Sequence, residues 1–340
     1  MKKILLSFII IVSISESYSQ TYKVSKKINI SGNGSWDYLA VDDMAQHLFV
    51  SHGNVVNVID LKSNKAIAVI PDTKGVHGIA IASDLNKTFI SNGKDNSITV
   101  VNLKTFKLIE KVKITGINPD AILYDQFSKK VFIYNGESND ATVIDAHTNK
   151  VVATIPLGGK PEFSVSNTKG LIYVNIEDKN EIKTINASTL KVTNSWSIAP
   201  GDEPSGLAID LITNRLFSVC SNKVMVVVDA ANGKIIKTVP IGAGCDGVAF
   251  DAKKNLIFSS NGEGSITVIK ENNANTFSVV ETVKTQKGAR TIALNKTTEQ
   301  LYLSVADFRV KPKPTMESPK PRSGIVPNSF TVLVVGPISK

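Results

Sequence analysis

Short hydrophobic runs, separated by turns rich in Asn, Asp and Gly, recur along the whole chain. One of these runs carries a central aromatic residue and appears seven times, as LFVS, TFIS, VFIY, IYVN, LFSV, IFSS and LYLS. The aromatic residues are Phe49, Phe89, Phe132, Tyr173, Phe217, Phe258 and Tyr302. Successive members of this series lie 40, 43, 41, 44, 41 and 44 residues apart. A period of this length, built from short strands and turns, predicts propeller blades.

Each repeat contains four runs that predict strands, which in the second repeat span residues 78–81, 88–91, 98–102 and 108–114. We expect mostly small residues at one position of the first strand, because seven such strands crowd around a single axis. The residues assigned to that position are Ala40, Ala80, Ile122, Ser164, Ala208, Ala249 and Ala293.

The two ends of the chain complement each other. The seventh repeat supplies only three strands, the last at 331–335, whereas residues 22–30 have the character of a fourth. We therefore predict an all-β fold, a seven-bladed β-propeller of four-stranded blades closed by the N-terminal strand, which completes the last blade. Because each repeat packs only on its neighbours, residues 20–340 can form a single domain.

Residues 1–19 have the features of a cleaved signal peptide. Met1-Lys2-Lys3 is basic, residues 4–14 are largely apolar, and Ser17-Tyr18-Ser19 supplies small residues before Gln20. These are the three parts of a secretory signal, and the apolar run is too short to span a membrane. We expect an exported protein, periplasmic or secreted, without a membrane span.

Charge and cysteine content limit the choice of binding partner only weakly. The formal net charge is +9, and lysine supplies nearly all of the positive charge, since the only arginines are Arg215, Arg290, Arg309 and Arg322. Phosphate recognition tends to use arginine, so nucleic acid is a possible partner but not the favoured one. The two cysteines, Cys220 and Cys245, could form a disulfide in an oxidising compartment or remain buried thiols.

The candidate site lies just before the predicted inner strands. In a propeller, these connections share one face, here called the top face, with the loops between the second and third strands of each blade. Loops on a rigid scaffold commonly carry binding residues. The candidate ligand-binding residues are Asp37, His77, Asp120, Glu162, Asp246 and Arg290, with Ser205 at the same position in the fifth repeat.

These side chains have three interpretations. Asp, Glu and His could hold a divalent cation or polarise a water molecule for hydrolysis. Alternatively, Arg290 and His77 could clamp an anionic group while the carboxylates bind hydroxyls or amines. The third interpretation is that the side chains only cap turns and link blades by hydrogen bonds. Glu177 and Asp178 are further candidates in a neighbouring loop. No cofactor is predicted beyond a possible divalent metal ion.

A long loop in the last blade, residues 307–330, is rich in proline and basic residues. Loops of this length without their own secondary structure are usually functional or disordered. Its expected place on the top face makes it a candidate lid, with Arg309, Lys311 and Lys313 as the lid residues. A merely extended surface loop is the alternative.

The repeats resemble those of a known family. SITVVNLKTFKLIEKVKI and ATVIDAHTNKVVATIPLGG are similar to the YVTN-type repeat of the YncE-like β-propellers, as are GGKPEF, EPSGLAID and GARTIAL. The resemblance implies an exported seven-bladed propeller and carries no agreed catalytic residues. DNA binding has been linked to this type of protein, without contact residues that can be placed on this sequence.

The favoured function is an exported binding protein that holds a small polar ligand, a metal ion or a protein partner at the top-face channel mouth. The alternative is a metal-dependent lactonase-type hydrolase, by analogy with propellers that hold an axial metal, with Glu162, Asn175, Asp120 and Asp246 as ligands of suitable chemistry. The second alternative is single-stranded nucleic-acid binding. The GxSxG, HExxH, CxxCH and Walker motifs are absent, so no catalytic residue is predicted.

Overall fold

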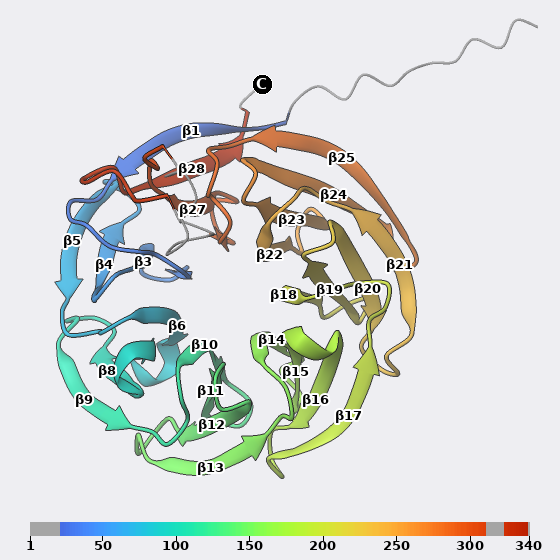
Figure 1. Ribbon diagram of the computed structural model, residues 1–340, viewed down its shortest axis with the longest axis horizontal. Helices are drawn as coiled ribbons and strands as arrows, with labels where there is room; N and C mark the ends of the chain where they lie inside the picture. The colour runs from blue at the N-terminus through green and yellow to red at the C-terminus, as the bar shows by residue number, and fades with distance from the viewer. Residues whose placement is uncertain (1–20, 311–322, 339–340) are drawn as a thin grey trace, which may run out of the picture.

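The computed structural model describes residues 21–310 and 323–338, which form seven four-stranded antiparallel sheets arranged as a ring (Figure 1). The predicted signal peptide, residues 1–19, lies outside the described residues, so export stays a prediction. Lys311 and Lys313 of the predicted lid also lie outside them. Within the described ranges, no helix has the length and apolar character that crossing a membrane requires.

Each blade is one sheet whose first strand lies nearest the axis. The first blade consists of β2 (Leu39–Asp42), β3 (His47–His52), β4 (Val55–Asp60) and β5 (Lys65–Ile70). The second consists of β6 (Val76–Ala82), β7 (Lys87–Asn92), β8 (Ser97–Asn102) and β9 (Leu108–Lys113). The third consists of β10 (Pro119–Asp125), β11 (Lys130–Asn135), β12 (Asp140–Asp145) and β13 (Val151–Pro156).

The next three blades repeat this order. The fourth consists of β14 (Pro161–Ser166), β15 (Leu171–Ile176), β16 (Glu181–Asn186) and β17 (Lys191–Ser197). The fifth consists of β18 (Pro204–Asp210), β19 (Arg215–Cys220), β20 (Val224–Asp229) and β21 (Ile235–Pro240). The sixth consists of β22 (Cys245–Asp251), β23 (Leu256–Asn261), β24 (Ser265–Asn273) and β25 (Thr276–Lys284).

The hydrophobic core lies between neighbouring blades. The aromatic residues that define the repeat are at most 1% exposed. Phe89 of the second blade, for example, belongs to the same buried cluster as Val131 and Ile133 of the third. A repeat fold in which each unit buries its apolar face against the next unit requires this arrangement.

In the third and fourth blades, the inner-strand residue opposite the aromatic side chain differs from the one that the sequence predicted. The pairing register places Ala80 opposite Phe89, and Leu123 and Val165 occupy the same position opposite Phe132 and Tyr173. The assignment of Ile122 and Ser164 to this position was therefore wrong by one residue. The expectation of a small residue selected Ser164 instead of Val165. The pairing register, however, is counted from the aromatic residue of the second strand.

The last blade joins the two ends of the chain. Its sheet has the order β1 (Tyr22–Asn29), β28 (Thr331–Pro337), β27 (Leu301–Val305) and β26 (Ala293–Leu294). β1 pairs antiparallel with β28, and Figure 1 shows it on the outer rim beside β25. The predicted closure by the N-terminal strand is confirmed. It gives the seventh blade the outer strand that its own repeat lacks.

We predict that closure depends on Ile28, one of the two buried residues of β1. Ile28 is 6% exposed and packs in one cluster with Val332 and Val334. Ile28→Ala should lower the free energy of unfolding by about 2–4 kcal/mol in urea denaturation, because it leaves a cavity. Lys26→Ala, at an exposed position of the same strand, is the matched control and should change it by less than about 0.5 kcal/mol. Equal effects would show that β1 does not hold the ring closed.

Candidate functional site

One backbone hydrogen bond, repeated from blade to blade, fixes the entrance to each inner strand. The loop after the second strand donates an N–H to a carbonyl that lies two residues before the candidate side chain. Gly93 N bonds to Gly75 O at 2.9 Å, ahead of His77. The equivalent bonds of other blades join Gly53 to Ser35 (2.7 Å), Gly136 to Asn118 (3.0 Å), Glu177 to Lys160 (2.8 Å) and Gly262 to Gly244 (2.8 Å). The candidates of these five blades, Asp37, His77, Asp120, Glu162 and Asp246, therefore occupy one structural position, which places them on the top face.

A second set of bonds ties the backbone of these residues to the neighbouring blade. Ser91 Oγ donates to the carbonyl of Asp120, and Thr291 Oγ1 donates to the carbonyl of Asp37 at 2.8 Å. Asn175 Nδ2 likewise donates to the carbonyl of Ser205 at 2.9 Å. The main-chain carbonyl groups of these candidate residues thus link neighbouring blades. The third interpretation had expected such inter-blade links from the side chains. The carboxylates of Asp37 and Asp120 take no part in these main-chain bonds.

Asp37, His77 and Asp120 form a compact group. His77 Nδ1 lies 2.7 Å from Asp37 Oδ2 and 3.6 Å from Asp120 Oδ1. The ligating atoms of all three residues lie within 4.8 Å of one another. The opposite edge of the imidazole lies against Gly93, where an added Cβ would be 2.8 Å from Nε2. Because any larger residue at position 93 would displace the ring, this glycine helps to set the direction of Nδ1.

Burial and mutual repulsion change the ionisation of this group. Burial, together with the charge of Asp37, raises the pKa of Asp120 to about 7 against the opposing effect of His77. Burial alone would lower the pKa of His77, but the hydrogen bond to Asp37 and the charge of Asp120 outweigh it and raise that pKa. Asp120 Oδ1 is buried and has no hydrogen-bond partner among the described residues. An unpaired carboxylate oxygen at this depth is uncommon.

Glu162, 8% exposed, is held by a lysine that the sequence analysis did not select. Lys160 Nζ lies 2.7 Å from Glu162 Oε1 and also forms an ion pair with Glu177. Burial and the charge of Asp120 nevertheless raise the pKa of Glu162. The sequence signal for Lys160 was its position two residues before Glu162. In the structure, the carbonyl of Lys160 accepts the repeated backbone hydrogen bond.

Asp246 and Arg290 form the remaining pair of the set. Arg290 Nε lies 2.9 Å from Asp246 Oδ2, and the arginine side chain is 50% exposed. Burial raises the pKa of Asp246 to about 6 although Arg290 opposes this change, and Asp37 adds to it. We call Asp37, His77, Asp120, Glu162, Asp246 and Arg290 the axial ring. The structure brings all six together, since their charges act on one another across the axis.

Tyr38, which the sequence analysis also missed, lies beneath the axial ring. Its ring centroid is 5.6 Å from that of Phe163, and both line a small cavity of about 20 Å³ together with Thr291 and Ile292. Burial and the charges of four carboxylates, Asp120 first, hold the pKa of Tyr38 well above its usual range. Its only sequence signal was its position next to Asp37.

Two other candidates have structural roles. Asn175 Oδ1 accepts a hydrogen bond from Ser218 Oγ at 3.1 Å, so the set Glu162, Asn175, Asp120 and Asp246 is not assembled as a ligand group. Ser205 Oγ donates to Cys245 O at 3.4 Å. Cys220 and Cys245 are buried free thiols, with Cys245 Sγ 3.0 Å from Cys220 O. Burial raises the pKa of both to about 12.

The base of the predicted lid is ordered beside the axial ring. Phe308 and Ile325 form a β-bridge, and Arg309 N donates to Gly324 O at 2.7 Å. Trp36, which precedes Asp37, packs between Phe308 and Phe330 with centroid distances of 5.9 and 5.5 Å. Arg309 itself is exposed. A lid role for Arg309, Lys311 and Lys313 stays a prediction.

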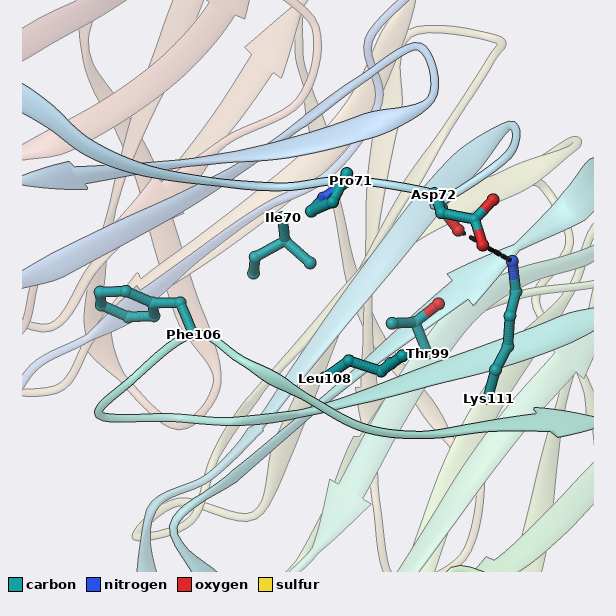
Figure 2. A pocket seen from close by; sticks show the side chains of 7 residues that line it. All are labelled: Ile70, Pro71, Asp72, Thr99, Phe106, Leu108 and Lys111. Atoms are coloured by element: carbon teal, nitrogen blue, oxygen red, sulfur yellow. Dashed lines mark hydrogen bonds and ion pairs between the residues drawn. The ribbon is translucent and has the colours of Figure 1, made fainter.

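An unrelated hollow lies on the outer wall between the first two blades. Figure 2 shows Ile70, Phe106 and Leu108 around it, with the Asp72–Lys111 ion pair (3.1 Å) at one end. Its volume is about 100 Å³. None of the axial-ring residues lines it, so it contributes nothing to the candidate site.

The raised pKa of Asp120 predicts a pH dependence of stability. The folded protein keeps this proton up to about pH 7, whereas the unfolded chain releases it near pH 4. Stability therefore falls as the pH rises through this window. Asp120→Asn should unfold in urea like the wild type near pH 4, and should be more stable near pH 8 by on the order of 1 kcal/mol.

Glu137→Gln is the control for this experiment, because Glu137 is an exposed acid of the same blade. It should leave the pH profile unchanged. An Asp120→Asn profile that runs parallel to that of the wild type would show that Asp120 does not hold a proton at the axis.

Comparison with known proteins supports the fold. Residues 18–168 match the family model "YNCE-like beta-propeller". No curated protein matches the sequence. Among solved structures, hydrazine synthase of Kuenenia stuttgartiensis is 15% identical with a TM-score of 0.71, covering 81% of this chain and 94% of that chain. The WD40 repeats of RRP9 are 10% identical with a TM-score of 0.77, covering 93% and 99%.

A chain of the mitotic checkpoint complex is also similar, at 10% identity with a TM-score of 0.76 and complete coverage of both chains. At these identities, the similar structures establish the propeller architecture and nothing about activity. The family match covers residues 18–168, less than half of the chain, whereas the ring of seven blades covers the whole of the described part. Together they confirm the resemblance found in the repeats: residues 18–168 match the YncE-like family model, and the described residues form a seven-bladed β-propeller.

Proposed function

We propose that the protein is a binding protein whose axial ring takes up a divalent metal ion. The observation that carries this proposal is the group of Asp37, His77 and Asp120, whose ligating atoms lie within 4.8 Å of one another. One imidazole nitrogen and two carboxylate oxygens suit Zn²⁺, Mn²⁺ or Fe²⁺. Asp120 Oδ1, which accepts no hydrogen bond from a described residue, would supply one of the metal-ligating oxygen atoms.

The charge of the axial ring favours a cation over an anion. Asp37, Asp120, Glu162, Asp246 and the adjoining Glu177 are five carboxylates, against the cations Lys160 and Arg290 and the titratable His77. Lys160 and Arg290 are already in ion pairs with Glu162 and Asp246. An anion would therefore have to displace a carboxylate, whereas a cation would relieve the repulsion between the remaining ones. The same surplus disfavours phosphate, and hence nucleic acid, at the mouth.

Metal binding would exchange a proton for the ion. The 2.7 Å contact between His77 Nδ1 and Asp37 Oδ2 is a hydrogen bond, and the same nitrogen must lose its proton to become a ligand. Glu162 and Asp246 lie outside this group and would set the charge around the ion. Gly93 and the backbone bond of Gly75 would keep the imidazole in place.

The test is isothermal titration calorimetry with Zn²⁺ and Mn²⁺ at neutral pH. The wild-type protein should bind one ion, and Asp120→Asn and His77→Ala should each weaken binding by at least about tenfold, because each removes a ligand. Asp246→Asn is the matched control from the same ring and should change the affinity by less than about threefold. Absence of binding, or equal affinities for Asp120→Asn and wild type, would contradict the proposal.

Metal-dependent hydrolysis of a lactone is the second candidate function. It is favoured by Asp246, a partly buried carboxyl with a pKa of about 6, which burial and the charge of Asp37 raise. A carboxylate of this pKa can act as a general base near neutral pH. Arg290, bonded to Asp246 at 2.9 Å, would orient it.

For this candidate, we predict that Asp246→Asn lowers kcat for lactone hydrolysis by at least about a hundredfold while metal affinity is kept. Turnover by the metal-loaded protein would be followed with a pH indicator, before and after chelation. If the loaded protein has no turnover, or if chelation leaves turnover unchanged, the protein is not a metal-dependent lactonase.

A further inference from the structure

A second cavity opens on the top face next to the axial ring. It has a volume of about 400 Å³ and is lined by residues 31–35, His52, Gly53, Asn54, Val55 and Lys94. We call it the loop cavity. The segment 31–35 leads directly into Trp36 and Asp37, and Lys94 belongs to the loop that holds His77. The volume is within the range of sites that bind small molecules.

His52 contributes a buried nitrogen that has no partner in the described part of the chain. The residue is 3% exposed, and its Nδ1 lies 3.2 Å from Asn57 Oδ1. Because an amide oxygen only accepts hydrogen bonds, Nδ1 carries the proton and Nε2 presents a lone pair. Nε2 is buried and makes no hydrogen bond to a described residue. Buried polar atoms rarely remain in this state unless a ligand or water completes them.

The edge of the imidazole that carries Nε2 faces the segment 31–35. A Cβ added at Gly32 would lie 3.2 Å from Cε1 of His52, and one added at Gly34 would lie 3.2 Å from Cδ2. These two carbon atoms flank Nε2. The flat face of the imidazole stacks on Phe330 at 4.2 Å between centroids, which fixes its plane. Gly32 also has a φ of +112°, a conformation that favours glycine.

The rest of the loop cavity offers hydrogen-bond donors and positive charge. Within the described ranges, the backbone N–H groups of residues 31–35 donate to no other residue. Lys94 is exposed and forms no ion pair with a described residue. Consecutive free backbone N–H groups beside a lysine are a common arrangement for binding an anionic group.

We propose that the loop cavity binds a small hydroxylated anion, of the chemical class of sugar acids and sugar phosphates. Its anionic group contacts Lys94 and the N–H groups of residues 31–35, and one of its hydroxyls donates to Nε2 of His52. This specificity is the opposite of that proposed for the axial ring. None of the axial-ring residues lines the loop cavity, so anion binding in the loop cavity does not rest on metal binding at the axial ring.

The test is calorimetric titration of metal-free protein, prepared by chelation and dialysis, with gluconate and with glucose 6-phosphate. Sorbitol supplies the hydroxyls without the charge, and acetate supplies the charge without the hydroxyls. At least one of the two hydroxylated anions should bind one per chain, at least about tenfold more tightly than sorbitol or acetate. Which of them binds distinguishes a carboxylate from a phosphate ligand.

Variants of the lining residues assign the binding to this cavity. Lys94→Met should weaken it by at least about tenfold, and Lys94→Arg by less than about threefold. Lys74→Met, an exposed lysine close by that does not line the cavity, should have no effect. His52→Phe keeps the stacking on Phe330 and should abolish the preference over acetate.

The proposal is overturned if neither hydroxylated anion binds at concentrations up to about 10 mM. It is also overturned if Lys94→Met binds as tightly as Lys74→Met, or if sorbitol or acetate binds as well as the hydroxylated anions. The Lys94 variants decide the question even if His52→Phe does not fold.

Discussion

The backbone hydrogen bond between each second-to-third-strand loop and the residue that enters the inner strand is the constraint on which the site depends. It recurs at 2.7–3.0 Å in blades whose loops differ in sequence, from Gly53 and Gly93 to Glu177. Because it is a main-chain bond, it fixes position without fixing side-chain identity. The same place can therefore carry Asp, His or Glu, and the ring can vary its chemistry without altering its frame.

The axial ring concentrates more negative charge than the surrounding bases neutralise. Lys160 and Arg290 each pair with a ring carboxylate, yet the pKa values of Asp120, Glu162 and Asp246 are all raised. Burial makes each isolated charge costly, and neighbouring carboxylates add to that cost. The seven inter-blade cores supply the stability that allows the fold to keep such a ring. A cation or proton bound at the ring would therefore lower the free energy of the folded protein.

Two regions whose side chains carry opposite charge share the top face. The axial ring is rich in carboxylates, whereas the loop cavity combines Lys94, free backbone N–H groups and the lone pair of His52. The segment that connects them, from Ser31 to Asp37, lines one region and supplies a residue of the other. Its Trp36 also packs on the base of the long loop of the last blade. One short segment thus links the chain closure, both regions and that loop.

The amino-acid sequence alone determined the repeat, the number of blades, the closure by β1 and the identity of the axial residues. These follow from local periodicity, since every blade buries the same aromatic position. Only the tertiary structure decided which ring residues are partners, because Asp37 and His77 lie 40 residues apart and their contact depends on how adjacent blades pack. The roles of Lys160, Tyr38 and His52 were also decided there. Tyr38 and His52 pack against other blades or the chain closure, whereas Lys160 pairs with Glu162 and Glu177 of its own blade. No periodicity in the sequence records such contacts.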